Sequence, residues 1–360
     1  MPAPPSFLIQ AGIGLVVAFA TSVFATRLVL AALRSRQILD HPNHRSSHAV
    51  PTPRGGGWGV LAGMTLGTAV LLTLAGIPEW LPMLAAATIL VVALSWLDDL
   101  GDLPAFTRLL VQFMAVAVAL AGLLSVAGLS DLDAAGNAFG TVVGAVGLVG
   151  TFGAGAVVMV GYVWFVNLYN FMDGIDGITA VQTLFILCGI ALVSGIAGRS
   201  DPELVLFPPV VAAAAGGFLV WNWHPAKVFL GDVGSVPLGL VVGFFLATLA
   251  AKGHVASALI LPLYYIADAT LTLLRRILRR EAFWRPHRTH WYQRAALSIG
   301  HRKTVLIIAA GNAGLVALSI LALARPVMAL VAALAWTTGL LVLLSRSAGV
   351  RRSAAAGPAP

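Results

Sequence analysis

Residues 81–104 read LPMLAAATILVVALSWLDDLGDLP, an apolar run that carries no charged residue before Asp98 and Asp99. About 20 apolar residues in a helix span the hydrocarbon core of a bilayer, so this run predicts a transmembrane helix. Similar runs recur along the 360 residues, of which 59% are hydrophobic and 10% charged. A soluble domain carries about 25% charged residues. The composition therefore excludes a water-soluble globule and indicates an all-α, polytopic integral membrane protein.

The apolar runs predict a bundle of about eleven transmembrane helices, 10 to 11 by their spacing. Eleven such helices use roughly 220 residues, which leaves no room for a second soluble domain. Residues 1–344 are therefore expected to form a single transmembrane domain, and residues 345–360 a disordered cytoplasmic tail. The expected helices are 8–33, 58–76, 81–97, 108–127, 150–168, 177–197, 206–223, 235–251, 255–274, 304–323 and 327–344.

The stretch 138–168 is apolar over too great a length for one span. Its part 141–149 is rich in Gly and Val with partial alternation, so a hairpin or surface segment on the outer face is expected there. The helix should then begin near Thr151.

The basic residues set the expected orientation. With the N-terminus outside, eighteen of the 22 Lys and Arg residues fall on the cytoplasmic side, and the C-terminus is cytoplasmic. This asymmetry accounts for the net charge of +8 through insertion and contact with membrane lipids, so no nucleic-acid partner is expected. The single cysteine, Cys188, excludes an intramolecular disulfide or a thiolate metal cluster.

Acidic side chains gather at this cytoplasmic side. Asp98 and Asp99 end a helix that runs from outside to inside, where the negative end of the helix dipole disfavours carboxylates unless a cation compensates. Asp102 is either part of the same group or the N-cap of the next helix.

Two further motifs offer oxygen ligands. Residues 167–177 read NLYNFMDGIDG, with Asn170, Asp173 and Asp176 at the cytoplasmic end of a helix. Carboxylate and amide oxygens of this kind suit Mg²⁺, and the spacing does not match an EF-hand loop. In 229–237, FLGDVGSVP, Asp232 is either a helix N-cap or a metal ligand beside a phosphate held by free backbone N–H groups.

Two cytoplasmic loops carry cations suited to phosphate. The last one contains His287-Arg288-Thr289-His290, where an arginine fork is flanked by histidines. The first one, HPNHRSSHAVPTPRGGG, adds a glycine run whose amides could approach an anion; its candidate residues are Arg45, His48 and Arg54. Together with the oxygen ligands, these loops imply a water-soluble diphosphate that meets a lipid-embedded phosphate.

In this order, the motifs Pro-Thr-Pro-Arg-Gly-Gly-Gly, Asp-Asp-x-x-Asp, Asn-x-x-Asn-Phe-x-Asp-Gly-x-Asp-Gly, Phe-Leu-Gly-Asp-Val-Gly-Ser and His-Arg-x-His resemble those of the polyprenyl-phosphate N-acetylhexosamine-1-phosphate transferases, glycosyltransferase family 4. The resemblance covers residues 40–295. It implies transfer of a sugar-1-phosphate from a UDP-sugar donor to an undecaprenyl phosphate acceptor, with release of UMP. It also implies Mg²⁺ as cofactor, with Mn²⁺ as the alternative ion, and a bacterial inner membrane with a cytoplasmic active site.

The resemblance assigns roles to individual residues. It implies that Asn170 and Asp232 bind Mg²⁺. It implies that Asp98 and Asp99 take part in catalysis and activate the carrier phosphate. Nucleotide or metal contact falls to Asp173 and Asp176, and diphosphate binding to His287, Arg288 and His290. Asp268 has a family counterpart, and we interpret it as a packing or loop-orienting group.

Two differences from the motif pattern of the peptidoglycan branch suggest which branch of the family this chain resembles. The peptidoglycan branch typically has Lys after its Asp pair and three consecutive histidines in the last loop, whereas this chain has Asp102 and His287-Arg288-Thr289-His290. These features resemble enzymes that initiate O-antigen of lipopolysaccharide, or similar surface glycans. The alternatives are phospho-MurNAc-pentapeptide transfer and, from another class, an ion-coupled transporter. A homodimer is compatible with the sequence.

Overall fold

The computed structural model describes residues 5–40, 50–101, 103–127, 138–198, 201–281 and 287–355, and this part of the chain is helical apart from one two-stranded sheet. The strands β1 (Leu39–Asp40) and β2 (Thr52–Pro53) pair antiparallel. The helices are α1 (Pro5–Ser35), α2 (Gly57–Ala75), α3 (Leu81–Gly101), α4 (Ala105–Ala127), α6 (Ala138–Phe171), α7 (Ile178–Ile196), α8 (Pro202–Asn222), α9 (Asp232–Ala251), α10 (Val255–Ile260), α11 (Leu263–Leu278), α12 (Trp291–Ile299), α13 (His301–Leu321) and α14 (Pro326–Ala355).

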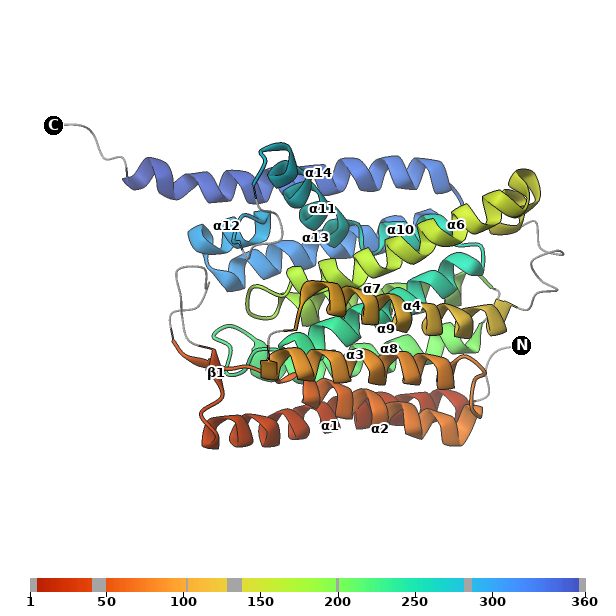
Figure 1. Cartoon of the computed structure of the whole chain (residues 1–360), viewed down its shortest axis with the longest axis horizontal. Coiled ribbons are helices and arrows are strands. Elements are labelled where there is room, and N and C mark those ends of the chain that lie inside the picture. The colour runs from red at the N-terminus through yellow and green to blue at the C-terminus, as the bar shows by residue number, and fades with distance from the viewer. Residues whose placement is uncertain are drawn as a thin grey trace.

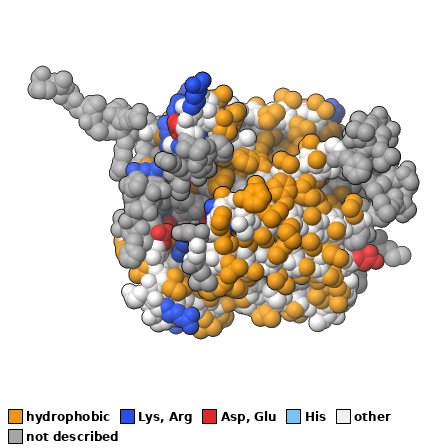
Figure 2. Space-filling model, in the orientation of Figure 1, with side chains coloured by type: hydrophobic (Ala, Val, Ile, Leu, Met, Phe, Trp, Pro, Cys, Tyr) orange, Lys and Arg blue, Asp and Glu red, His pale blue; other side chains and the backbone are white. Residues whose placement is uncertain are grey.

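The helices lie side by side as a bundle, with α1 and α2 at one edge and α14 at the other (Figure 1). Within the described residues, eight helices are long and apolar enough to cross a membrane, and Gly57–Thr73 and Gly155–Phe171 are shorter apolar helices. The space-filling view shows a broad apolar surface between two ends where charged side chains gather (Figure 2). An all-α polytopic membrane protein is therefore confirmed, while the count of eleven spans remains a prediction.

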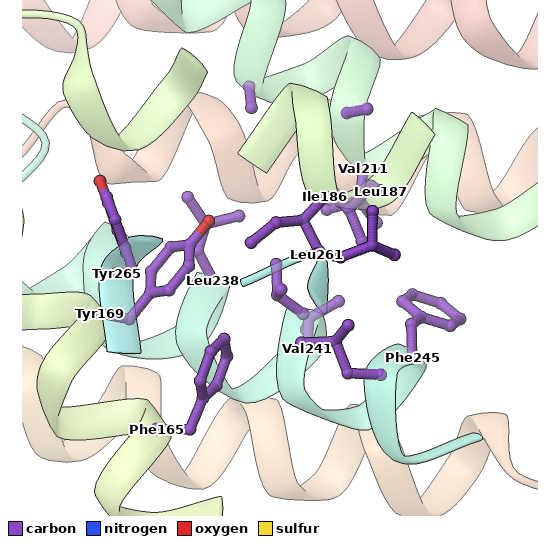
Figure 3. Packing of buried hydrophobic residues seen from close by; sticks show 14 of the residues in the cluster. Phe165, Tyr169, Ile186, Leu187, Val211, Leu238, Val241, Phe245, Leu261 and Tyr265 are labelled. Atoms are coloured by element: carbon purple, nitrogen blue, oxygen red, sulfur yellow. The ribbon is translucent and has the colours of Figure 1, made fainter. Parts of the chain in front are cut away.

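The core is built around α9, whose residues are buried almost without interruption. A helix that is apolar on all sides is expected in the interior of a bundle. Around it, Tyr169 of α6 packs between Phe165 of the same helix and Tyr265 of α11 (Figure 3). Because α9 begins at Asp232, this packing fixes the acidic end of the central helix at the end of the bundle where β1, β2 and α12 lie (Figure 1).

Three sequence expectations are corrected here. Residues 141–149 belong to α6, a continuous helix of 34 residues, rather than to a hairpin. The stretch contains no proline, and an apolar segment in a bilayer satisfies its backbone groups best as a helix. Residues 345–355 continue α14 instead of being disordered, since Ala and Arg favour helix and no proline intervenes; 356–360 lie outside the described residues.

The third correction concerns the expected span 255–274, which is broken at Leu261 and Pro262 into α10 and α11. Proline lacks the N–H group that would continue the helical bonding, which explains the break. The end of α3 also differs, because it reaches Gly101 rather than residue 97. Asp98 and Asp99 therefore lie in the last turn of this helix, as the sequence predicts.

Candidate active site at one end of the bundle

The glycine run after Arg54 packs against the loop that precedes α9. The N–H groups of Gly55 and Gly56 donate to the carbonyl of Phe229, at 3.1 and 2.8 Å, and Gly57 N donates to Leu230 O at 2.9 Å. A Cβ atom on Gly57 would lie 2.4 Å from Cα of Gly234, so only glycine fits. The expected anion cradle is therefore corrected: these amides bond to carbonyl groups, and their effect is to place Arg54 beside α9.

Arg54 lies among carboxylates from two helices. Its Nη2 is 2.5 Å from Oδ1 of Asp232, the first residue of α9, and 3.7 Å from Oδ1 of Asp99 at the end of α3. Burial alone would lower the pKa of Arg54, but Asp232 and Asp99 together raise it above its ordinary value. Arg54 is thus the cation that compensates carboxylates at a helix end.

Asn170 joins the same cluster from α6. Its Nδ2 donates to Oδ1 of Asp232 at 3.1 Å and to Oγ of Ser235 at 2.8 Å. Asp173 lies just beyond α6, where burial raises the pKa of its carboxyl to about 6; Asp232 adds to this effect, while Thr179 and Arg54 oppose it. The structure therefore brings together four of the residues that the sequence singled out, Arg54, Asp99, Asn170 and Asp232, with Asp173 adjacent.

The two adjacent aspartates at the end of α3 have different surroundings. Oδ1 of Asp98 accepts from Leu103 N at 2.8 Å, and its Oδ2 is 3.0 Å from Nη1 of Arg108. Asp98 therefore ties the end of α3 to the start of α4, and only 12% of its side chain is exposed, against 26% for Asp99. Asp99 alone of the pair contacts Arg54. The expected N-cap role of Asp102 lies outside the described residues.

The two histidines of the last loop have different surroundings. His290 is 3% exposed, and its Nδ1 lies 3.2 Å from Oδ1 of Asp268. The same buried carboxylate accepts from the backbone N–H groups of Trp291 and Tyr292, both at 3.1 Å, and from the hydroxyls of Tyr264 and Thr272. His290 thus caps α12 beside Asp268, and its contact with a diphosphate stays a prediction. The loop-orienting interpretation of Asp268 is confirmed.

The rest of this loop is oriented by α12. The Tyr292 hydroxyl donates to Phe171 O at 3.0 Å, which joins α12 to the end of α6. His287 stacks on His290 with ring centroids 5.0 Å apart. Burial, followed by electrostatic interaction with His290 and Arg276, lowers the pKa of His287 to about 4, so His287 is neutral at pH 7 and offers hydrogen bonds rather than charge. Arg288 is exposed. Arg45 and His48 lie outside the described residues.

Asp176 sits in a separate cluster that sequence reasoning missed. Its Oδ2 lies 2.6 Å from Nδ1 of His224, and its Oδ1 is 3.3 Å from Nδ1 of His301. Burial alone would raise the pKa of Asp176, but hydrogen bonds from His301, His224 and the backbone of Ala226 lower it below its ordinary value. The signal in the sequence was weak: His224 and His301 stand alone, far from each other and from Asp176 along the chain.

The Arg54 cluster has a donor set that fits a divalent cation. Asp99, Asp173 and Asp232 supply carboxylates and Asn170 an amide, all hard oxygen donors of the kind that Mg²⁺ prefers. Asn170 and Asp232, the expected metal ligands, are within hydrogen-bond distance of each other. The residues present therefore fit a magnesium ion bound together with the phosphates of a substrate.

Comparison with known proteins agrees with the family resemblance of the sequence motifs. The glycosyl transferase family 4 model matches residues 81–250, which include Asp99, Asn170 and Asp232. The decaprenyl-phosphate N-acetylglucosaminephosphotransferase of Mycobacterium leprae is 29% identical over 326 residues, 82% of this chain and 79% of that protein. The probable undecaprenyl-phosphate N-acetylglucosaminyl 1-phosphate transferase of Bacillus subtilis is 31% identical over 126 residues, only 33% of this chain and 35% of that protein.

A third relative represents another branch. The phospho-N-acetylmuramoyl-pentapeptide-transferase of Moorella thermoacetica is 47% identical over 57 residues, 15% of this chain and 18% of that protein. The family match, the relatives and the order of the motifs agree, and each of them supports glycosyl transferase family 4 as the family that this chain resembles.

Proposed function

We propose that the protein transfers an N-acetylhexosamine-1-phosphate from a UDP-sugar to undecaprenyl phosphate and releases UMP. The match to glycosyl transferase family 4 and the names of the relatives support a glycosyl-1-phosphate transferase, and the mycobacterial and Bacillus relatives are named for polyprenyl-phosphate and N-acetylglucosamine. The observation that carries the proposal is the convergence of Arg54, Asp99, Asn170 and Asp232 at one end of an apolar bundle. A water-soluble UDP-sugar and a phosphate carried by a membrane lipid can both reach a site at the end of such a bundle.

The proposed chemistry is a direct displacement. An oxygen of the carrier-lipid phosphate forms a bond to the β-phosphorus of the UDP-sugar, and the bond from that phosphorus to the bridging oxygen breaks, so that UMP leaves with the electron pair. A phosphate monoester has its second pKa near 6, so the nucleophile is largely dianionic at neutral pH. The reaction therefore depends on positioning and charge stabilisation more than on a strong base.

The residues of the Arg54 cluster have distinct proposed tasks. Asn170 and Asp232 would hold Mg²⁺, with Asp173 nearby, and the ion when bound would neutralise the diphosphate and the departing UMP. Arg54 offers a planar fork that suits phosphate oxygens. Asp99 is the carboxylate placed to accept a residual proton from the carrier phosphate, because Asp98 is held by Arg108.

A two-step route through an aspartyl-phosphate is the mechanistic alternative. In this cluster it would use Asp99, the more exposed of the two adjacent aspartates. Incubation with UDP-sugar alone, followed by mass spectrometry of the peptide around 98–99, distinguishes the routes. The direct displacement predicts no modified peptide, and Asp99 carrying the sugar-1-phosphate group would contradict it.

The proposed setting is the cytoplasmic face of a bacterial inner membrane, in the initiation of a surface glycan such as O-antigen. Phospho-MurNAc-pentapeptide transfer is the second candidate, favoured by the short but closer match to the Moorella relative. The two differ in the donor, since one uses a simple UDP-N-acetylhexosamine and the other a UDP-linked muramoyl-peptide.

The experiment is UMP release by the purified protein from a panel of UDP-N-acetylhexosamines and UDP-MurNAc-pentapeptide. Each donor is tested with and without undecaprenyl phosphate, and with Mg²⁺, Mn²⁺ or EDTA. Release that needs the carrier and a divalent cation, with a simple UDP-N-acetylhexosamine, is the expected result. Release only from the muramoyl-peptide donor would move the protein to the peptidoglycan branch. No release from any donor by folded protein would contradict the proposal and favour a transporter.

A further inference from the structure

The first turn of α9 packs closely against the last turns of α6. A Cβ atom on Gly239 of α9 would lie 3.2 Å from both Cα and O of Val166 in α6, so a larger residue would push the two helices apart. Ser235 precedes Gly239 by four residues, and Asn170 follows Val166 by four residues. Because helix residues four apart share a face, the packing that needs Gly239 also brings Ser235 to Asn170.

Ser235 meets Asn170 as a hydrogen-bond acceptor. The Ser235 side chain is buried, and its Oγ donates to the carbonyl of Gly231 at 3.2 Å. A hydroxyl group has one proton, so its contact with Asn170 has to be accepted through a lone pair. The donor is Nδ2 of Asn170, at 2.8 Å.

The surroundings of Asn170 decide which of its polar atoms is left for a ligand. Its Nδ2 also donates to Oδ1 of Asp232 at 3.1 Å, and that carboxylate is paired with Arg54. An ionised carboxylate only accepts hydrogen bonds, as Ser235 does toward Asn170, so the amide nitrogen has to face both groups. Both N–H groups of Asn170 are then engaged. The amide oxygen, Oδ1, is the atom that remains to bind a cation.

Ser235 and Asp232 differ in how well they can keep this orientation. Asp232 binds Arg54 through the same oxygen and is itself a proposed metal ligand, so a bound cation would compete for its charge. Ser235 is uncharged and buried, and its contact with Asn170 does not compete with a cation. Ser235 is therefore the partner whose bond to Asn170 can persist when the site is loaded.

We propose, building on the proposed divalent-cation site of the transferase, that Ser235 is a positioning residue: its hydroxyl accepts from Nδ2 of Asn170 and thereby presents the amide oxygen of Asn170 to the cation. Without this acceptor, the amide can turn about its Cβ–Cγ bond and place its N–H₂ group, which cannot coordinate a cation, at the site. Loss of a partner that orients a metal ligand typically weakens metal binding by about 10- to 100-fold.

The test is binding of Mn²⁺ alone to the purified protein, followed by the electron paramagnetic resonance signal of free Mn²⁺. Ser235→Ala should weaken Mn²⁺ binding about tenfold. Ser235→Thr, which keeps the hydroxyl, should recover most of the affinity. Ser257→Ala is the matched control, because it removes another buried hydroxyl, which donates to Ser319 O at 2.7 Å beyond the other end of α9. This control should keep the wild-type affinity even if its unfolding temperature falls.

A double-mutant cycle shows whether Ser235 acts through Asn170. Asn170→Ala and the double variant Asn170→Ala/Ser235→Ala should bind Mn²⁺ equally weakly, since Ser235 has no amide left to orient. A further loss in the double variant would contradict the positioning role and indicate that Ser235 acts on the cation by another route.

The outcomes separate this inference from the proposed function. A wild-type protein that binds no Mn²⁺ would contradict the metal site itself and this inference with it, whereas carrier-dependent UMP release is measured independently. Equal Mn²⁺ affinity in the wild type and in folded Ser235→Ala would contradict only the role of Ser235. If Ser235→Ala does not fold, Ser235→Cys carries the same test, because its sulfur is a weak acceptor and should also weaken Mn²⁺ binding.

Discussion

At the scale of single residues, the adjacent carboxylates at the end of α3 divide their tasks. Asp99 points to Arg54, whereas Asp98 binds Leu103 N and Arg108. Nothing in a sequence of two consecutive aspartates distinguishes them, because the distinction depends on how the last turn of the helix is rotated against its neighbours. In the structure, Asp99 is therefore a residue of the candidate site, whereas Asp98 has a structural role.

This division gives a first prediction. Asp99→Asn should lower kcat for UMP release at least about tenfold while leaving the thermal unfolding temperature nearly unchanged, since the lost charge is at the site. Asp98→Asn should instead lower the free energy of unfolding by roughly 1–3 kcal/mol, because Arg108 loses a charged partner. Kinetics and thermal unfolding in detergent measure both. The opposite pattern, with an inactive but stable Asp98→Asn, would contradict the assignment.

Two buried carboxyls predict opposite effects of pH on stability. The pKa of Asp173 is about 6 in the fold, above its ordinary 3.8, so ionisation of this residue destabilises the fold as pH rises through that interval. The pKa of Asp176 is lowered, so its stabilising effect is present above its ordinary pKa and is lost as pH falls below it.

The matching variants should therefore shift stability in opposite directions. In EDTA at about pH 7.5, Asp173→Asn should raise the unfolding temperature and Asp176→Asn should lower it; the first difference should shrink toward about pH 4, whereas the second should shrink only below about pH 4. Thermal unfolding across this pH range is the measurement. Shifts of the same sign at pH 7.5 would show that the surroundings of one carboxyl are misassigned.

At the scale of elements, the contact between the start of α2 and the start of α9 decides whether the site forms. Gly57 and Gly234 approach so closely that a Cβ on Gly57 would lie 2.4 Å from Cα of Gly234. This contact holds the loop with Arg54 against the N-terminus of α9.

Gly57→Ala should accordingly separate the two helices, abolish transfer and lower the yield of folded protein. Gly161→Ala in α6, where nothing lies within 4 Å of the added Cβ, is the matched control and should keep full activity with equal or higher stability. Size-exclusion profiles and UMP release test both variants. A fully active Gly57→Ala would contradict the close approach.

The elements also show where sequence patterns stop being informative. Apolar runs located α3, α7, α9 and α13 well, because length and composition are local properties. The same local signal failed at 141–149, where glycine and valine suggested a hairpin or surface segment although a bilayer favours one long helix. His290 looked like a phosphate ligand, and only the fold shows that it caps α12 on the buried Asp268.

At the scale of the whole molecule, charge is concentrated at the ends of an apolar body (Figure 2). The candidate residues Arg54, Asp99, Asn170 and Asp232 come from four separate segments, yet they meet at one end. The sequence predicted this common end from the positive-inside rule and the order of motifs. It could not predict the cluster of Asp176, His224 and His301, since those residues are joined only by the packing of α7 against α8 and α13.

The orientation of the molecule can be tested directly. In a Cys188→Ala background, a cysteine at Glu281 should resist a membrane-impermeant thiol reagent added to intact cells, and a cysteine at Glu79 should react. Both positions are exposed and lie at opposite ends of the bundle. Labelling of Glu281→Cys, with protection of Glu79→Cys, would place the candidate active site on the outer face and contradict the proposed topology.

The central claim is that the cluster around Asp232 is where phosphoryl transfer occurs. The most direct measurement is carrier-dependent UMP release by Asp232→Ala, compared at equal folded protein with Glu79→Gln, which removes an acidic charge at the opposite end. We predict loss of release by at least about a hundredfold in Asp232→Ala and wild-type release in Glu79→Gln. Full activity of folded Asp232→Ala would contradict the account.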